Sequence, residues 1–189
     1  VYAEQVIALL DHLEVDSAVL LGTSLGANAS LFAAARHPHR VRGLVIEMPV
    51  LEWAVPSAAL TFVPMLLAVH YGGRVLRLLG AGARAVRSPS DFVEAILDVV
   101  RADPDSIAAV LHGILVGPVA PTVDQRRAIS TPVLVLAHRG DPIHPFRDAR
   151  NLERHLEGAR MVIARTPLEL RLAPGRLIGE ITGFLDDLF

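Results

Sequence analysis

Four short apolar runs of strand length alternate with stretches of helical periodicity, and this alternation limits the folds open to the chain. The runs are residues 18–21, 41–48, 132–137 and 160–164. Because helical patterns separate them, the runs favour parallel strands that are buried on both faces by crossover helices. We therefore predict an α/β fold with a mostly parallel sheet flanked by helices.

A longer segment without a strand pattern, residues 51–130, separates the second run from the third. It carries helix signals of its own, and an insertion of this size after a strand is expected to form a helical cap over the carboxyl edge of the sheet. We therefore divide the chain into two parts. Residues 1–50 and 131–189 form a partial α/β core, and residues 51–130 form a helical cap or lid.

The composition is that of a globular protein. Hydrophobic residues make up 52% of the 189 residues and charged residues 20%, which excludes a disordered chain. The formal net charge is -2 and no segment collects charge of one sign, so we expect no nucleic-acid partner. The chain contains no cysteine, which excludes thiolate chemistry and zinc sites built on cysteine.

The longest apolar run, residues 54–69, is short for a bilayer span and contains Pro56 and Pro64. We interpret it as lid or core and expect no membrane partner. No charged leader is followed by a small-residue cleavage site, so a cytoplasmic location is the default expectation. The sequence opens with Val1 inside a helical pattern, and we expect it to be a fragment of a longer protein.

Residues 22–26 read Gly-Thr-Ser-Leu-Gly and fit the pattern G-x-S-x-G, with a predicted strand before it and a predicted helix after it. Such a tight turn lifts the serine hydroxyl clear of the sheet and needs glycines where side chains would collide. Ser24 is therefore a candidate nucleophile, and the backbone amide of Leu25 can stabilise an oxyanion. The alternative is that these residues form only a turn between strand and helix.

The chain resembles the alpha/beta-hydrolase fold family, serine hydrolase type with a helical cap, over nearly its whole length. The resemblance rests on VYAEQVIALLDHLEVDSAVLLGTSLGA, AARHPHRVRGLVIEMP and TPVLVLAHRGDPIHP, and on the closing strand and helix; the family's amino-terminal strands have no counterpart. It implies that the catalytic acid follows the strand after the cap, where Asp141 stands, and that no metal or cofactor is needed. Alternatively, Asp141 only holds a loop, because Gly-Asp-Pro is a good turn sequence.

The resemblance also implies a histidine in the loop after the last strand, where this chain has none. Residues 164–169 read Ala-Arg-Thr-Pro-Leu-Glu, and Arg165 cannot act as the base because a guanidinium keeps its proton. The best substitute is His144, three residues beyond Asp141 on the same sheet edge; its other interpretation is a residue at the start of a helix. His138 ends the third strand, close to the acid loop.

Two functions are compatible with these residues. The first is a serine hydrolase that acts on an ester or related acyl substrate, with Ser24 as nucleophile and without a cofactor. The apolar cap suggests a partly hydrophobic small-molecule substrate, and Trp53 either lines the pocket or anchors the cap. The second is a non-catalytic protein of the same fold that binds a small apolar ligand, which the missing histidine favours.

Overall fold

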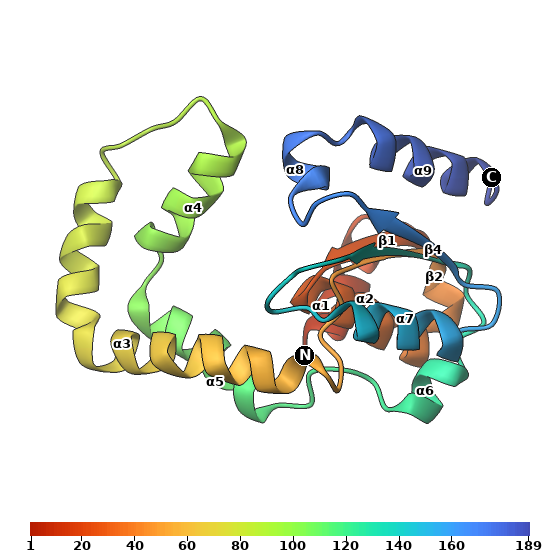
Figure 1. Cartoon of the computed structure of the whole chain (residues 1–189), viewed down its shortest axis with the longest axis horizontal. Coiled ribbons are helices and arrows are strands. Elements are labelled where there is room, and N and C mark those ends of the chain that lie inside the picture. The colour runs from red at the N-terminus through yellow and green to blue at the C-terminus, as the bar shows by residue number, and fades with distance from the viewer. The chain divides into compact units, whose positions relative to one another are not determined.

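Four parallel strands in sequence order form the sheet that carries the candidate site (Figure 1). The structure is a computed structural model that describes residues 1–90, 93–94 and 97–189. The strands are β1 (Ala18–Thr23), β2 (Val41–Glu47), β3 (Val133–His138) and β4 (Arg160–Ala164). Each neighbouring pair is parallel. The prediction of an α/β fold with a parallel sheet is therefore confirmed, and each strand matches one of the four apolar runs to within two residues at either end.

Helices cover both faces of this sheet, as Figure 1 shows. On one face, alternate strand residues such as Ile46 and Val135 pack with α2 (Leu25–Arg36) and α7 (Phe146–His155). The helix α1 (Tyr2–His12) packs on α2. Side chains along a strand point alternately to opposite faces, so the intervening residues face the other layer.

The opposite layer is built from the end of the chain. Val45, Leu134 and Leu136 are fully buried against α9 (Gly175–Asp186). Because the central strands β2 and β3 are covered on both sides, they consist of continuous apolar runs rather than alternating polar and apolar residues. The remaining short elements of this part are η1 (Pro38–Arg40), α6 (Val123–Arg127) and α8 (Glu169–Leu172).

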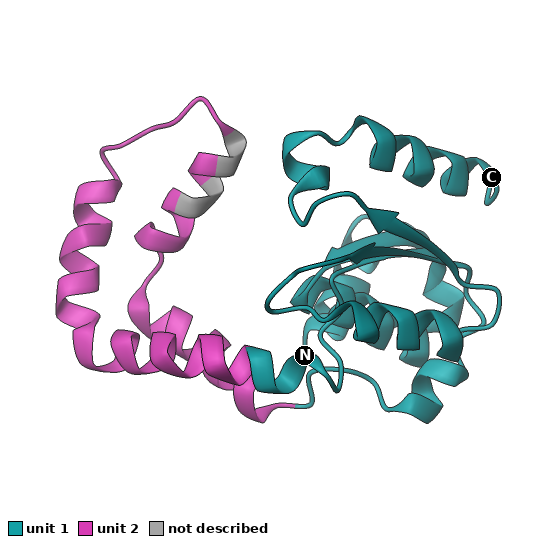
Figure 2. Cartoon of the chain, in the orientation of Figure 1, with its two compact units in different colours: residues 1–57, 118–189 teal, residues 58–117 magenta. Residues whose placement is uncertain are grey.

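The chain divides into two compact units, shown in different colours in Figure 2. The first comprises residues 1–57 and 118–189 and contains the whole sheet. The second comprises residues 58–117 and is narrower than the 51–130 range expected for the cap. Its helices are most of α3 (Ala54–Ala83), α4 (Asp91–Arg101) and α5 (Pro104–Val116).

The helix α3 is longer than the apolar run of residues 54–69 that was interpreted as lid or core, because it continues to Ala83 through Gly72 and Gly73. Within the described residues it is the one helix that is long and apolar enough to cross a membrane by length and composition. The core helix of a soluble protein passes the same test. The absence of a membrane partner therefore stays a prediction.

Candidate active site

Ser24 lies in the tight turn between β1 and α2, in the strand–turn–helix context that its motif predicts. Its backbone has φ 54° and ψ -116°, a region that non-glycine residues rarely adopt and that costs on the order of 1–3 kcal/mol. Its N–H donates to Glu47 O at 2.9 Å, and its carbonyl accepts from Asn28 N–H at 3.1 Å. The turn is therefore held on both sides by main-chain hydrogen bonds.

The two glycines of the motif have different roles. A Cβ at Gly22 would lie 2.3 Å from Gly26 O, so a side chain cannot be accommodated there without a shift of the backbone. A Cβ at Gly26 would meet no heavy atom within 4 Å. Steric need for glycine, which the sequence suggested for the motif as a whole, therefore applies to Gly22.

The structure places Ser24, His144 and Asp141 in a row. Ser24 Oγ lies 3.0 Å from His144 Nε2, and His144 Nδ1 lies 3.1 Å from Asp141 Oδ2. The His144 and Asp141 side chains are 13% and 7% exposed. With a proton on Nδ1, the ring donates to the carboxylate and its Nε2 accepts from the serine hydroxyl. This is the arrangement in which a histidine can take the proton of a nucleophile.

The Asp141 carboxylate is fixed by the backbone of its own loop. Its Oδ1 accepts from the N–H groups of Ile143 and His144, both at 2.8 Å. Burial alone would raise the pKa of this carboxyl, but these two amides and the His144 ring outweigh burial and lower the pKa below its usual value. Asp141 therefore stays ionised, and its free oxygen remains available to the His144 ring.

Leu25 is the first residue of α2. The amides of the first helical turn have no acceptor within the helix, and they lie at the positive end of its dipole. The Leu25 N–H directly follows Ser24 in the chain. Its position is compatible with the predicted oxyanion role, which stays a prediction.

Trp53 is half exposed and lies at the turn that leads into α3. The guanidinium of Arg147 stacks on its ring at 3.7 Å from the centroid. The backbone N–H of Trp53 donates to the buried carboxylate of Asp148, which also accepts from the backbone N–H groups of Leu51 and Ala54. Burial outweighs these hydrogen bonds and raises the pKa of Asp148. Sequence reasoning missed this contact of Asp148 with the turn before α3, because an acidic residue in the first turn of a helix is common.

Glu47 is a second residue that sequence reasoning missed. Its carboxylate is fully buried and accepts from the side chains of Thr23, His138 and Arg171. Burial alone would raise the pKa of this carboxyl, but the hydrogen bonds from these three side chains outweigh it and lower the pKa to about 2. His138, the other histidine near the acid loop, is thus bound to Glu47.

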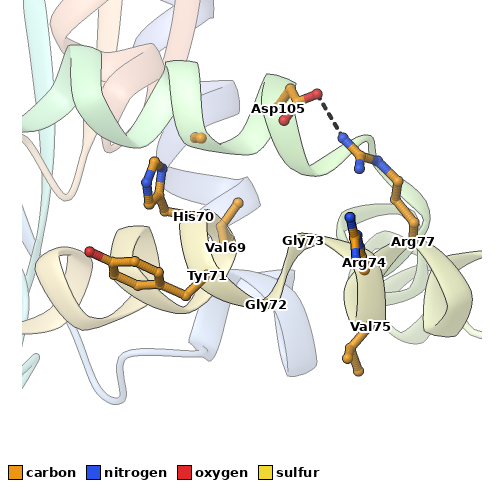
Figure 3. Close-up of a pocket in the computed structure, with 10 residues that line it drawn as sticks. Val69, His70, Tyr71, Gly72, Gly73, Arg74, Val75, Arg77 and Asp105 are labelled. Carbon is orange, nitrogen blue, oxygen red and sulfur yellow. Dashed lines mark hydrogen bonds and ion pairs between the residues drawn. The ribbon is translucent and has the colours of Figure 1, made fainter.

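The second unit contains a hollow of its own, of about 380 Å³, which Figure 3 shows in close-up. It is lined by α3 around Gly72 and Gly73 and by α5, and Arg77 binds Asp105 at 2.8 Å beside it. None of the predicted site residues lines this hollow. Among the described residues, no group of three or more His, Asp or Glu is placed to hold a metal ion.

Comparison with models of protein families gives a match over most of the chain. The family model described as alpha/beta hydrolase fold matches residues 1–166. A stretch of 46 residues is 44% identical to 2-hydroxymuconate semialdehyde hydrolase of Pseudomonas sp. strain CF600. This stretch is 24% of the present chain and 16% of that protein, so the similarity to this relative covers a small part of its length.

Solved structures resemble the chain over most of its length. An enol-lactonase from Burkholderia xenovorans LB400 has a TM-score of 0.72 and 20% identity, over 97% of this chain and 71% of that one. An esterase from Rhodococcus sp. ECU1013 has a TM-score of 0.70 and 22% identity, over 100% and 72% of the two chains. At these identities the likeness establishes the fold alone.

Proposed function

The chain belongs to the alpha/beta hydrolase fold family, and from this premise we propose that it is a serine hydrolase in which Ser24 attacks an ester or related acyl carbonyl. The observation that carries the proposal is the continuous row of hydrogen bonds from Ser24 Oγ through the His144 ring to Asp141. Each of the three side chains has the chemistry that its position in this row requires.

The proposed reaction begins when His144 Nε2 takes the proton of the Ser24 hydroxyl as the serine oxygen bonds to the carbonyl carbon. The Leu25 N–H donates to the oxyanion of the tetrahedral intermediate. Collapse of the intermediate breaks the bond to the leaving alcohol, which receives the proton from His144. A water molecule then attacks the acyl-enzyme, again with His144 as base, and releases the acid and free Ser24.

Asp141 holds the His144 ring in the proton state that this reaction needs. Its carboxylate accepts the Nδ1 proton, which leaves the electron pair of Nε2 directed at Ser24. When the ring becomes positively charged, the ionised carboxylate stabilises it. The lowered pKa of Asp141 supports this role, because the carboxylate then remains charged throughout the neutral range.

The proposed substrate is a small molecule with an ester, lactone or related acyl group. This class is supported by the names of two structurally similar proteins, an enol-lactonase and an esterase. Trp53, with its half-exposed ring, is the residue that we propose lines the substrate site. The proposed chemistry uses only side chains and one backbone amide, and no step requires a metal or an organic cofactor.

The experiment that tests this proposal is labelling of the protein with a fluorophosphonate probe, which reacts covalently with activated serines. We expect labelling of the wild type at Ser24 and none in Ser24→Ala, with hydrolysis of p-nitrophenyl butyrate lost in parallel. The competing hypothesis, a non-catalytic protein that binds a small apolar ligand, predicts an unlabelled wild type whose fluorescence still responds to such a ligand. That result would overturn the proposal.

A further inference from the structure

The buried carboxylate of Glu47, the last residue of β2, joins three parts of the molecule. Its Oε2 accepts from Thr23 Oγ1 and from Arg171 Nη2, both at 2.7 Å. Its Oε1 accepts from Arg171 Nη1 at 2.5 Å and lies 3.0 Å from His138 Nε2. Side chains from the end of β1, the end of β3 and α8 thus all bind the carboxylate of Glu47. We call these four residues the Glu47 cluster.

The same residue also holds the backbone of the turn that carries Ser24. The register of β1 and β2 places Thr23 opposite Glu47, and Glu47 O accepts from the Ser24 N–H at 2.9 Å. Glu47 therefore fixes Thr23 through its side chain and Ser24 through its main chain. A serine at a strained φ of 54° persists only where the surrounding structure over-determines its conformation.

We propose that Glu47 is a positioning residue for the nucleophile, which keeps the Ser24 hydroxyl within reach of His144. The inference rests on the proposed function, because it takes Ser24 as the nucleophile. Glu47 touches neither substrate nor reacting atoms in this role, and it acts through the turn. A small displacement of a reacting group can cost about 100-fold in rate, so a residue that holds the turn affects turnover without contact with the substrate.

Arg171 and His138 connect the segment after β4 to this turn through the Glu47 carboxylate. Arg171 binds the carboxylate through two nitrogens, a fork geometry that fixes direction as well as distance, and its Nη2 also lies 3.3 Å from Thr23 Oγ1. His138 Nδ1 lies 3.2 Å from Thr166 O and its Nε2 lies 3.0 Å from Glu47 Oε1, so the ring bridges the loop after β4 and the Glu47 carboxylate. The segment that lacks the family's histidine is thus bound to Glu47 and Thr23, the two residues that hold the turn at Ser24.

Removal of any buried carboxylate from an arginine destabilises a protein, so the test needs a matched control. Glu169 provides it. Its side chain is 6% exposed and binds Arg176 through two nitrogens at 2.8 and 2.9 Å. Arg176 is as exposed as Arg171, at 30% against 29%. The Glu169 carboxylate also accepts from the Arg165 N–H, and neither Arg165 nor Arg176 belongs to the turn at Ser24.

The experiment compares Glu47→Gln, Thr23→Val and Glu169→Gln with the wild type, each well below its own Tm. The measurements are kcat and KM for p-nitrophenyl butyrate and the rate of fluorophosphonate labelling at Ser24. In Glu47→Gln we expect kcat and the labelling rate to fall about 10- to 100-fold, with KM within about twofold. Thr23→Val keeps the side-chain shape and loses one hydroxyl, so we expect a fall of about 3- to 10-fold.

Glu169→Gln should keep kcat within about threefold of the wild type, because its carboxylate does not touch the turn. Equal losses in Glu47→Gln and Glu169→Gln, or a change in KM alone, would overturn the positioning role. If Glu47→Gln does not fold, Thr23→Val decides, and an unchanged kcat in that variant overturns the inference. A wild type that is not labelled at Ser24 refutes the proposed function and this inference together, whereas a labelled wild type with unchanged variants refutes this inference alone.

Discussion

Two segments at the carboxyl edge of the sheet differ in the residues that they bring to the candidate site. The segment after β3, residues 139–145, contains both the acid and the histidine of the proposed triad, 3.1 Å apart. The segment after β4, residues 165–172, contains Glu169 and Arg171, whose partners are other protein side chains. Under the proposed function, the first segment supplies reactive groups and the second supports the turn at Ser24.

The two segments also differ in the range of their interactions. The carboxylate of Asp141 accepts from the amides of Ile143 and His144, so the first segment is ordered largely by itself. Arg171 instead reaches Glu47, which is 124 positions away in the sequence. A local loop can place an acid beside a base without help from the rest of the fold, whereas support of the turn at Ser24 depends on distant parts of the chain.

The largest effect that separates the two segments is expected from His144→Ala. Loss of the base should lower kcat/KM for p-nitrophenyl butyrate by about 10³- to 10⁵-fold. The Tm should change far less, because alanine at position 144 keeps the two backbone hydrogen bonds that order the loop at Asp141. Steady-state kinetics and thermal unfolding measure the two quantities. An unchanged rate would place the base elsewhere and remove the contrast.

A smaller loss is expected from Asp141→Asn. The amide oxygen of asparagine can still accept from the backbone of residues 143 and 144, but its side chain no longer offers a charge to the His144 ring. We expect kcat to fall about 10²- to 10⁴-fold with little change in Tm. Asp141→Ala is the companion variant, which should lose both activity and stability, because two backbone amides lose their acceptor. Turnover close to wild type in Asp141→Asn would contradict the role of the acid.

The pH dependence of stability tests the supporting segment. Hydrogen bonds from Arg176 and from the Arg165 amide lower the pKa of Glu169 from 4.5 to about 2. A lowered folded-state pKa stabilises the protein above the ordinary value, and this contribution is lost as the pH falls from 4.5 toward 2. Glu169→Gln should therefore have a lower Tm than the wild type at pH 7, and the two should converge near pH 2. Thermal unfolding by circular dichroism, from pH 2 to 7, measures this; a constant gap would argue against the ion pair.

The smallest effect is expected at Arg165, an exposed residue in the loop where the family has its histidine. Its amide, not its side chain, binds Glu169. Arg165→Ala should therefore leave kcat within about twofold and the free energy of unfolding within about 0.5 kcal/mol. Urea unfolding and ester turnover check the two values. A large loss of turnover would mean that this loop takes part in the chemistry and would break the comparison.

The sequence was sufficient for the strands and for the turn at Ser24. A strand that is buried on both faces needs a continuous apolar run. Strands such as β2 and β3 can therefore be told apart from the helical patterns around them. Asp141 and His144 could be paired because three positions in one loop are a short distance. The expectation that His144 lies beside Asp141 thus depended on their closeness in sequence, not on a long-range contact.

The remaining contacts could not be predicted because they join side chains that are distant in sequence. Glu47 ends a strand, and nothing in its neighbourhood along the chain indicates that Arg171 will bind it. Asp148 resembles any acidic residue in the first turn of a helix, yet it accepts three amides from the turn before α3. Such partners follow only from the packing of whole elements on the sheet.

The acid and the histidine on a single loop have a consequence for assembly of the proposed catalytic centre. When three groups come from three separate segments, two independent alignments must be correct at once. Here Asp141 and His144 lie in one loop between β3 and α7 and are hydrogen-bonded to each other, so a single alignment, from His144 Nε2 to Ser24 Oγ at 3.0 Å, remains to be set. Fewer independent alignments are therefore needed to assemble the proposed centre. A shift of α9, which contains neither residue, would leave Asp141 and His144 in contact.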